Sequence, residues 1–253
     1  MKEKQTYTIS ETYELPSKGL VYDEPINPTV ELRSMTAEDE MKRLAVSDAP
    51  FKVLSDLIEN CIVNDFKMHV YDLCIGDYQF LLHKLRVVTY GPDYKMTVMC
   101  PNCHEIYTTT CNLDELEVTE YSEEFENQRV ITLPDSNKLI ELKLQTPRIL
   151  DTISRRKKDI IKRNPSITTD PGFILTIMSM IKTVDGQKLG EDSLEALIRH
   201  LGMKDVNFLV QKATKLNERL GLNTKFNSTC NHCNFETQST FRITPEFFGP
   251  TVD

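Results

Sequence analysis

The sequence lacks the patterns that mark many enzymes and most membrane proteins. It has no GxSxG, P-loop, GxGxxG or HExxH motif, and only five of its 253 residues are histidine. Those motifs carry nucleophilic, phosphate-binding and metal-dependent chemistries. The most apolar stretch, residues 173–181, falls far short of the ~20 residues that cross a bilayer. The sequence therefore predicts neither a recognisable catalytic constellation nor a membrane span.

Basic residues are in deficit as well. The chain has 30 Lys and Arg against 38 Asp and Glu, a formal net charge of −8. Such a charge opposes binding to nucleic acid and to anionic membranes. The opening residues, MKEKQTYTIS, lack the apolar core of a secretory signal, so we expect a cytoplasmic protein at synthesis. With 40% hydrophobic and 27% charged residues, the composition is that of a folded globular chain and excludes a fibrous or wholly disordered one.

Seven cysteines are present, and their spacing is the most specific chemical signal. Cys100 and Cys103 form one Cys-x-x-Cys pair, and Cys230 and Cys233 form a second. Each pair lies between β-prone runs, which places it at the tip of a hairpin. The two-residue gap lets both thiolates of a pair face one ion, and zinc takes four such ligands in a tetrahedron. We predict one structural zinc site at Cys100, Cys103, Cys230 and Cys233, with no open position for catalysis.

The distance between the pairs leaves alternatives open. The 126 residues between Cys103 and Cys230 far exceed the ~15–20 of a compact zinc ribbon, so one site requires a long insertion whose ends lie together. Two separate sites completed by His104 and His232 are the alternative. Iron also fits a tetrahedral thiolate site. A redox dithiol is disfavoured because neither pair opens a helix after a strand, and haem attachment at CPNCH would require export.

The three other cysteines stand apart from the pairs. Cys61 falls on the apolar face of an expected helix and is assigned to the core. Cys74 and Cys111 have no assigned role. Cys111, eight residues after Cys103, is the first substitute if one of the four proposed ligands is wrong.

Hydrophobic periodicity and turn signals predict an α+β fold, mainly helical with β-hairpins. In it, the two knuckle hairpins combine into one split zinc-ribbon-like four-cysteine site. The expected helices begin near 36, 50, 75, 146, 170, 194 and 206, and the second hairpin is expected at about 129–144. The predicted parts are an extended N-terminal arm (1–34), a helical region (35–93), a split zinc-ribbon-like module (94–112 and 222–253) and an inserted hairpin and helical region (113–221).

Two charge runs and an aromatic pair are further candidates. The acidic run, residues 114–126, holds seven carboxylates and no basic residue. We expect both this run and the basic run within residues 155–163 to be solvated, and we hypothesise that the two runs pair with each other or with other subunits. Phe247 and Phe248 are expected to pack on their own domain, with a docking anchor for a partner as the alternative. The basic run consists of Arg155, Arg156, Lys157, Lys158, Lys162 and Arg163.

Three features together resemble a known family. They are LPSKGLVY followed by ELRSMTAEDE, the CPNC knuckle, and the CNHC knuckle shortly before PEFFGP. This order resembles the baseplate hub proteins of T-even-like contractile-tailed bacteriophages. The resemblance implies a virion assembly protein, either a hub subunit or an assembly factor, whose partners are other tail and baseplate hub proteins. LPSKG is also similar to an element of phage tail assembly chaperones.

The same resemblance implies that the four paired cysteines hold zinc, and it carries over no active-site residue. It places the protein in the host cytoplasm during assembly or in the tail baseplate of the virion. The competing function is a zinc-ribbon nucleic-acid-binding or transcription accessory protein. Neither knuckle is basic, with Lys95 near the first and Lys225 and Arg242 near the second, which disfavours that function. An enzyme without a recognisable motif is the third class, and we expect no enzymatic activity.

Overall fold

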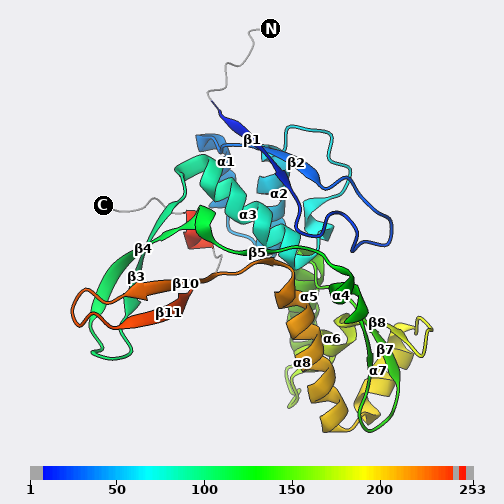
Figure 1. Ribbon diagram of the computed structural model, residues 1–253. Helices are drawn as coiled ribbons and strands as arrows, with labels where there is room; N and C mark the ends of the chain where they lie inside the picture. The colour runs from blue at the N-terminus through cyan, green and yellow to red at the C-terminus, as the bar shows by residue number, and fades with distance from the viewer. Residues whose placement is uncertain (1–7, 242–244, 249–253) are drawn as a thin grey trace.

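The computed structural model describes residues 8–241 and 245–248, in which helices alternate with small antiparallel sheets (Figure 1). The predicted mixture of helices and hairpins is confirmed. The α-helices are α1 (Ala37–Arg43), α2 (Pro50–Cys61), α3 (Ile75–Tyr90), α4 (Glu123–Asn127), α5 (Pro147–Arg163), α6 (Pro171–Ser179), α7 (Glu191–His200) and α8 (Met203–Arg219). The strands are β1 (Ser10–Glu14), β2 (Thr29–Arg33), β3 (Asp93–Met99), β4 (Ile106–Asn112), β5 (Val118–Thr119), β6 (Val130–Thr132), β7 (Leu139–Leu142), β8 (Ile181–Val184), β9 (Gly221–Leu222), β10 (Lys225–Thr229) and β11 (Glu236–Thr240).

The N-terminal helices begin where the local sequence directs them. Thr36 accepts a hydrogen bond from the Asp39 backbone N–H and Asp39 accepts one from the Thr36 N–H, so α1 starts with the expected capping box. Pro50 opens α2 at a position where its missing N–H costs nothing. Gly91, with φ of 85°, ends α3. These signals are local, which is why they could be recognised without the fold.

A first apolar core forms around α3. It joins the N-terminal hairpin, whose Val30 and Leu32 are fully buried, to α2 and to the bases of the two later hairpins. Cys61 lies in this core as expected. The remaining short elements, 3₁₀ turns at Val70–Asp72, Leu113–Glu115 and Pro245–Phe248, border it. Residues 8–34 are therefore packed onto the helical region, while residues 1–7 of the predicted arm lie outside the described part of the chain.

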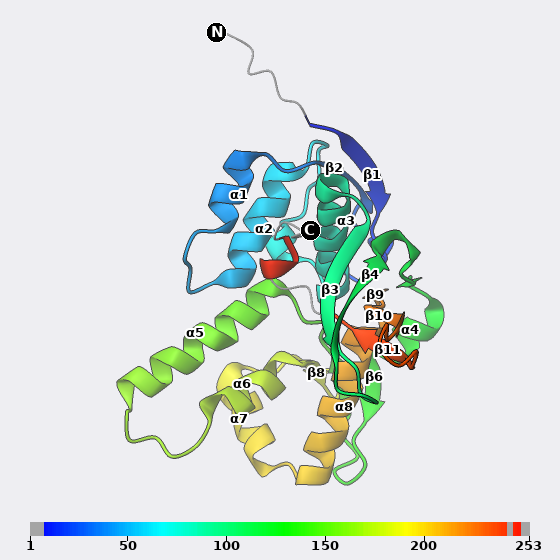
Figure 2. The ribbon, with the colours of Figure 1, turned by 90° about the vertical axis from the view of Figure 1, so that its left-hand side faces the viewer.

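A second core lies among α6, α7, α8 and the sheet β6-β7-β8. We expected residues 129–144 to form a two-stranded hairpin and the helix that begins near 170 to continue to about 181. Both expectations were incomplete, because Ile181–Val184 form β8 and add a third strand beside β7. The strand is only four residues long and continues an apolar helical stretch, so periodicity could not distinguish the two. Figure 2 shows α5 extending away from α1, α2 and α3.

The acidic run is more ordered than the solvated segment that we expected. Ser122 caps α4 by accepting from the Phe125 backbone N–H, and Phe125 is buried in the second core. Leu113, immediately before the run, is buried in the first core. The carboxylates are solvated, but Phe125 within the run and Leu113 just before it anchor this segment to both cores.

Two glycines allow the first turn of α3 to touch β9. A Cβ on Gly76 would lie 2.4 Å from the Leu220 carbonyl oxygen, and one on Gly221 would lie 2.8 Å from the Gly76 Cα. Gly221 also has φ of 100°, which disfavours other residues. This contact joins the two cores at the point where the chain leaves α8 for the second knuckle hairpin.

His83 predicts a specific pH dependence of stability. Its Nε2 donates to the Leu113 carbonyl oxygen at 2.9 Å and its Nδ1 is buried without a partner. Burial lowers the pKa of His83 from 6.5 to about 4. Between those values the unfolded chain binds the proton and the folded chain does not, so the stability present above pH 6.5 falls as the pH drops toward 4. The loss amounts to about 2–3 kcal/mol.

The measurement is urea unfolding of the wild type and His83→Gln at pH 7.0 and 4.5. Glutamine keeps a donor for the Leu113 carbonyl but does not titrate, so the variant should lose less stability on acidification. Comparing the two proteins cancels all other pH effects that they share. An identical pH dependence in both would contradict this role of His83.

Candidate metal centre

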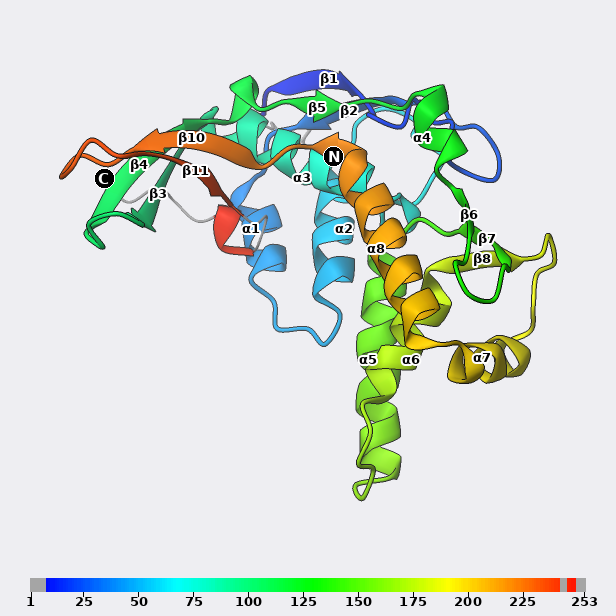
Figure 3. The same cartoon turned by 60° about the horizontal axis from the view of Figure 1, so that its bottom comes forward.

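Two hairpins from distant parts of the sequence carry the cysteine pairs. β3 pairs with β4 from Asp93↔Asn112 at the base to Met99↔Ile106 at the tip, and Cys100 and Cys103 lie in the turn. β10 pairs with β11 and presents the second pair in the same way. Figures 1 and 3 show the two hairpins side by side, projecting away from the helices. The ends of the long intervening segment therefore lie together, as a single site requires.

Both turns have the same backbone geometry. The N–H of Cys100 donates to the Glu105 carbonyl at 2.9 Å, and the N–H of Cys230 donates to that of Phe235 at 3.0 Å. The residue after each second cysteine has a positive φ, 61° at His104 and 57° at Asn234. This left-handed residue folds the chain back so that both sulfurs of a pair face the same side. The similarity of the two sequence segments therefore reflects a shared turn.

The four sulfurs form one compact cluster. All four Sγ atoms lie within 4.8 Å of one another. Cys100 Sγ lies 3.7 Å from Cys233 Sγ, and Cys103 Sγ lies 3.7 Å from Cys230 Sγ. A disulfide would need about 2.05 Å. Four sulfurs ~2.3 Å from a central zinc ion in a tetrahedron lie ~3.8 Å apart, so the spacing fits a shared ion and not a disulfide.

Hydrogen-bond donors reach two of the four sulfurs. The Asn102 side-chain amide donates to Cys233 Sγ at 3.6 Å, and the His232 backbone N–H donates to Cys230 Sγ at 3.4 Å. The Asn102 amide and the Phe235 backbone N–H lower the pKa of Cys233 to about 6. Such donors are the outer contacts that orient ligands in metal sites. The sequence indicated the cysteines but not Asn102, whose role depends on how the hairpins meet.

Little else holds the hairpin tips together. The apolar cluster there has three buried members, Cys100, Tyr107 and Cys230. Tyr107 Oη and Ser228 Oγ form a buried hydrogen bond of 2.9 Å between the hairpins. Each hairpin is a separate two-stranded sheet, and an isolated two-stranded hairpin is marginal in water. A bound ion would supply the missing cohesion.

The alternative ligand sets find no support in the described residues. Within them, the four cysteines are the one group of three or more His, Cys, Asp and Glu side chains close enough to share an ion. His104 and His232 are exposed and outside this group. Cys111 lies at the base of the first hairpin, opposite Tyr94, and is buried in the first core. Cys74 is buried at the start of α3 beside the Tyr22 hydroxyl.

Comparison with known proteins supplies the family. The family described as "T4 bacteriophage base plate protein" matches residues 6–249. The chain belongs to this family. Searches of curated proteins and of solved structures gave no match. The family is one of structural components of the phage tail, and it implies interaction with other tail proteins. The resemblance seen in the sequence is thus confirmed at the level of the T4-like baseplate.

The charge runs of this baseplate protein do not pair with each other in its described contacts. In the basic run, Arg156 pairs with Glu191, and Lys157 and Lys158 pair with Asp170 and Asp48 at 3.0 and 2.9 Å. Carboxylates of the acidic run pair elsewhere. The prediction that the two runs pair with each other is therefore wrong, whereas pairing with other subunits stays a prediction. The acidic-run pairs are Asp114–Lys84, Glu120–Lys18, Glu124–Arg219 and Glu126–Arg129.

The C-terminal aromatic pair packs on its own chain, as predicted. Phe247 and Phe248 are fully buried in the first core. Phe247 stacks on Phe241 with ring centroids 5.7 Å apart and an interplanar angle of 8°. Its carbonyl accepts from the Nε of the fully buried Arg86 at 3.0 Å. Arg86 was missed from the sequence, because a single arginine in a helix is expected at the surface.

No helix in the described ranges is both long enough and apolar enough to cross a membrane.

Proposed function

We propose that this protein is a non-enzymatic component of the central hub of a phage tail baseplate, acting through contacts with other hub proteins. The match of the baseplate family over residues 6–249 carries the proposal. The order of LPSKGLVY, CPNC, CNHC and PEFFGP, which resembles hub proteins, supports the hub in particular. Either a permanent hub subunit or an assembly factor fits these observations.

We further propose that the four cysteines hold one structural zinc ion in a split zinc-ribbon-like module. The 3.7 Å sulfur separations and the matched turns support a tetrahedral four-thiolate site. Residues 94–112 and 222–253 would form the module around an inserted region, 113–221. Residues 242–244 and 249–253 of this division lie outside the described chain.

The geometry favours a structural role over nucleic-acid binding. Four thiolates leave zinc no open position for substrate. The described parts of the two hairpins contain Lys95 and Lys225 as basic residues, against carboxylates at Asp93, Glu105 and Glu236. Arg242, which follows the second knuckle in the sequence, lies outside the described residues. A surface of this charge does not attract phosphates.

The test is recovery of an affinity-tagged copy from cells infected with the phage that encodes it. The proposal expects co-purification with baseplate hub proteins, and purified virions distinguish a hub subunit, which stays, from an assembly factor, which leaves. A copy carrying Cys103→Ser is the matched variant for dependence on the metal centre. Recovery of no tail component by the wild type would contradict the proposal.

A further inference from the structure

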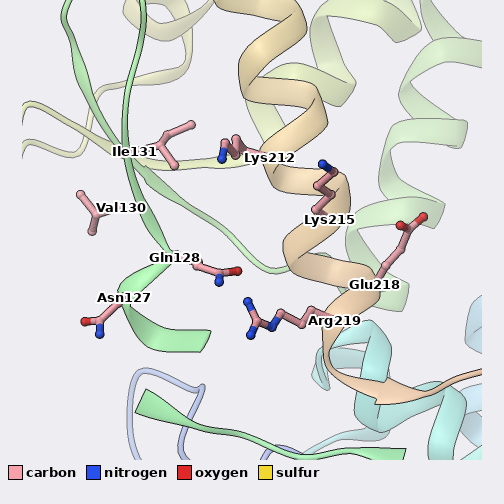
Figure 4. Close-up of a pocket in the computed structure, with 8 residues that line it drawn as sticks. All are labelled: Asn127, Gln128, Val130, Ile131, Lys212, Lys215, Glu218 and Arg219. Carbon is pink, nitrogen blue, oxygen red and sulfur yellow. The ribbon is translucent and has the colours of Figure 1, made fainter. Parts of the chain in front are cut away.

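A groove of about 620 Å³ lies between α8 and the segment that joins α4 to β6. One wall presents Lys212, Lys215 and Arg219, and the other presents Asn127, Gln128, Val130 and Ile131. Figure 4 shows Lys212 and Arg219 extending from α8 toward this segment and Gln128 extending back toward α8. The groove is far from the cysteine cluster in the fold, and neither the baseplate family nor the metal centre accounts for it (Figure 1).

The basic wall is a regular feature of α8. Lys212, Lys215 and Arg219 are spaced by three and four residues, so they form one stripe beside the buried Ala213 and Leu216. The stripe spans ~10 Å at 1.5 Å per residue, about the length of three extended residues. It is a local positive surface on a chain with a net charge of −8.

One member of the stripe already binds a carboxylate. Arg219 forms an ion pair of 2.8 Å with Glu124 of α4. Lys215 and Lys212 form no ion pair with any residue that the structure describes, although Lys212 lies 5.3 Å from the centre of the Phe208 ring. Glu218 also lines the groove, which leaves the wall with more positive than negative side chains. The stripe therefore has capacity for further carboxylates.

The opposite wall offers backbone hydrogen bonds. β6 pairs with β7 on one side and is the outer strand of its sheet. Leu142 N–H donates to the Arg129 carbonyl at 2.7 Å and Leu133 N–H donates to that of Lys138 at 2.9 Å. Because pairing alternates along an antiparallel strand, these bonds direct the N–H and C=O groups of Val130 and Thr132 away from β7. Among the described residues no second strand pairs with β6, and Val130 is 49% exposed, so this edge has room for another strand.

We propose that the groove binds an extended acidic segment of a partner protein. The segment adds a strand at Val130 and Thr132, and its carboxylates lie on Lys212 and Lys215. Backbone pairing supplies affinity and the alternate side chains supply selectivity in such strand addition. The charge of the wall excludes a basic segment, and the strand edge favours a peptide over a nucleic acid. This inference rests on the proposed assembly role at one point only: that role suggests that the acidic segment belongs to another tail protein.

Fluorescence anisotropy with synthetic peptides tests the site on the full chain. The probes are a labelled, end-blocked octapeptide of alternating Glu and Thr, its Lys counterpart, and the Glu peptide with alternate backbone N-methylation. We expect the Glu peptide to bind and the other two to bind at least about tenfold more weakly, because one loses charge complementarity and the other loses backbone pairing. Equal binding of the Glu and Lys peptides would overturn the proposal.

Matched variants locate the binding. Lys212→Glu with Lys215→Glu should weaken the Glu peptide about tenfold, whereas Lys162→Glu with Lys188→Glu makes the same charge change elsewhere and should not. Val130→Pro removes an outward N–H and should weaken binding several-fold, whereas Val130→Ala keeps it and should not. Circular dichroism and metal content confirm that each variant is folded. Unchanged binding in the Lys212 and Lys215 variant would overturn the site.

Two other occupants are outcomes of the same experiment. If a single-stranded oligonucleotide displaces the labelled peptide more strongly than the unlabelled Glu peptide does, the groove binds nucleic acid and the proposal of a protein partner is overturned. Self-association of the wild type that is lost in the Lys212 and Lys215 variant would replace the partner with a second copy. The groove is tested with synthetic peptides, whereas the baseplate role is tested by recovery of tail proteins from infected cells. Failure of the peptide experiment therefore leaves the proposed baseplate role standing.

Discussion

Replacing Cys230 with serine is expected to abolish tight metal binding and to separate the tips of the two knuckle hairpins. Cys230 is fully buried, and its Sγ lies 3.7 Å from that of Cys103. Structural zinc contributes ~10 kcal/mol or more to the folding of small modules, and among the described residues the buried side chains beside the cysteines are Tyr107 and Ser228, which share one hydrogen bond. Loss of one thiolate should therefore lower the free energy of unfolding by about 4 kcal/mol or more, measured by urea unfolding with metal content recorded in parallel.

Cys111→Ser is the matched control. Cys111 lies on the same hairpin as the first pair and is also buried, but it belongs to the first core and not to the cysteine cluster. This variant should lose some stability through a buried hydroxyl while it keeps its full metal content. Addition of a strong chelator to the wild type should reproduce the Cys230→Ser phenotype. Full metal content in Cys230→Ser would show that Cys230 is not a ligand.

Replacing Arg86 with alanine is expected to release the C-terminal turn from the first core. Arg86 is fully buried, donates to the Phe247 carbonyl at 3.0 Å and lies 4.8 Å from the centre of the Tyr90 ring. It also donates to the Gly91 carbonyl at 3.3 Å. Truncation leaves both carbonyls without this donor and opens a cavity, so the free energy of unfolding should fall by about 3–4 kcal/mol. Urea unfolding measures the loss.

Two further variants separate the causes. Arg86→Met keeps much of the side-chain volume without the guanidinium, so it should recover the packing part of the loss and not the hydrogen-bonding part. Arg155→Ala, at an exposed position of α5, should change stability by less than about 0.5 kcal/mol. Metal content should stay at the wild-type value in all three. A change below about 1 kcal/mol in Arg86→Ala would contradict the anchoring role, given the usual cost of an unpaired buried group.

The sequence predicted the parts of the fold that depend on local signals. Thr36, Pro50 and Gly91 each fix a helix end through contacts within a few residues. The two Cys-x-x-Cys turns were likewise recognisable, since each turn is formed by its own six residues. That both pairs meet depended on one further argument, the preference of zinc for four ligands.

What the sequence did not reveal depends on contacts between distant segments. β8 exists because Ile181 and Val184 pack beside β7, which lies about forty residues earlier in the chain. Arg86 is buried because the C-terminal turn covers it, and the sequence around residue 86 does not indicate that this distant turn packs there. The groove of Lys212 and Lys215 is formed only when α8 lies beside β6. The hydrophobic periodicity of one segment does not indicate which distant segment packs against it.

The most direct test of a single shared metal centre is the metal content of the freshly purified full-length protein. Inductively coupled plasma mass spectrometry on protein of known concentration gives the identity and the number of ions per chain. A four-thiolate centre joining both hairpins predicts one zinc ion per chain. Two ions per chain would mean that each knuckle binds its own metal, and stoichiometric iron in place of zinc would contradict the proposed ion.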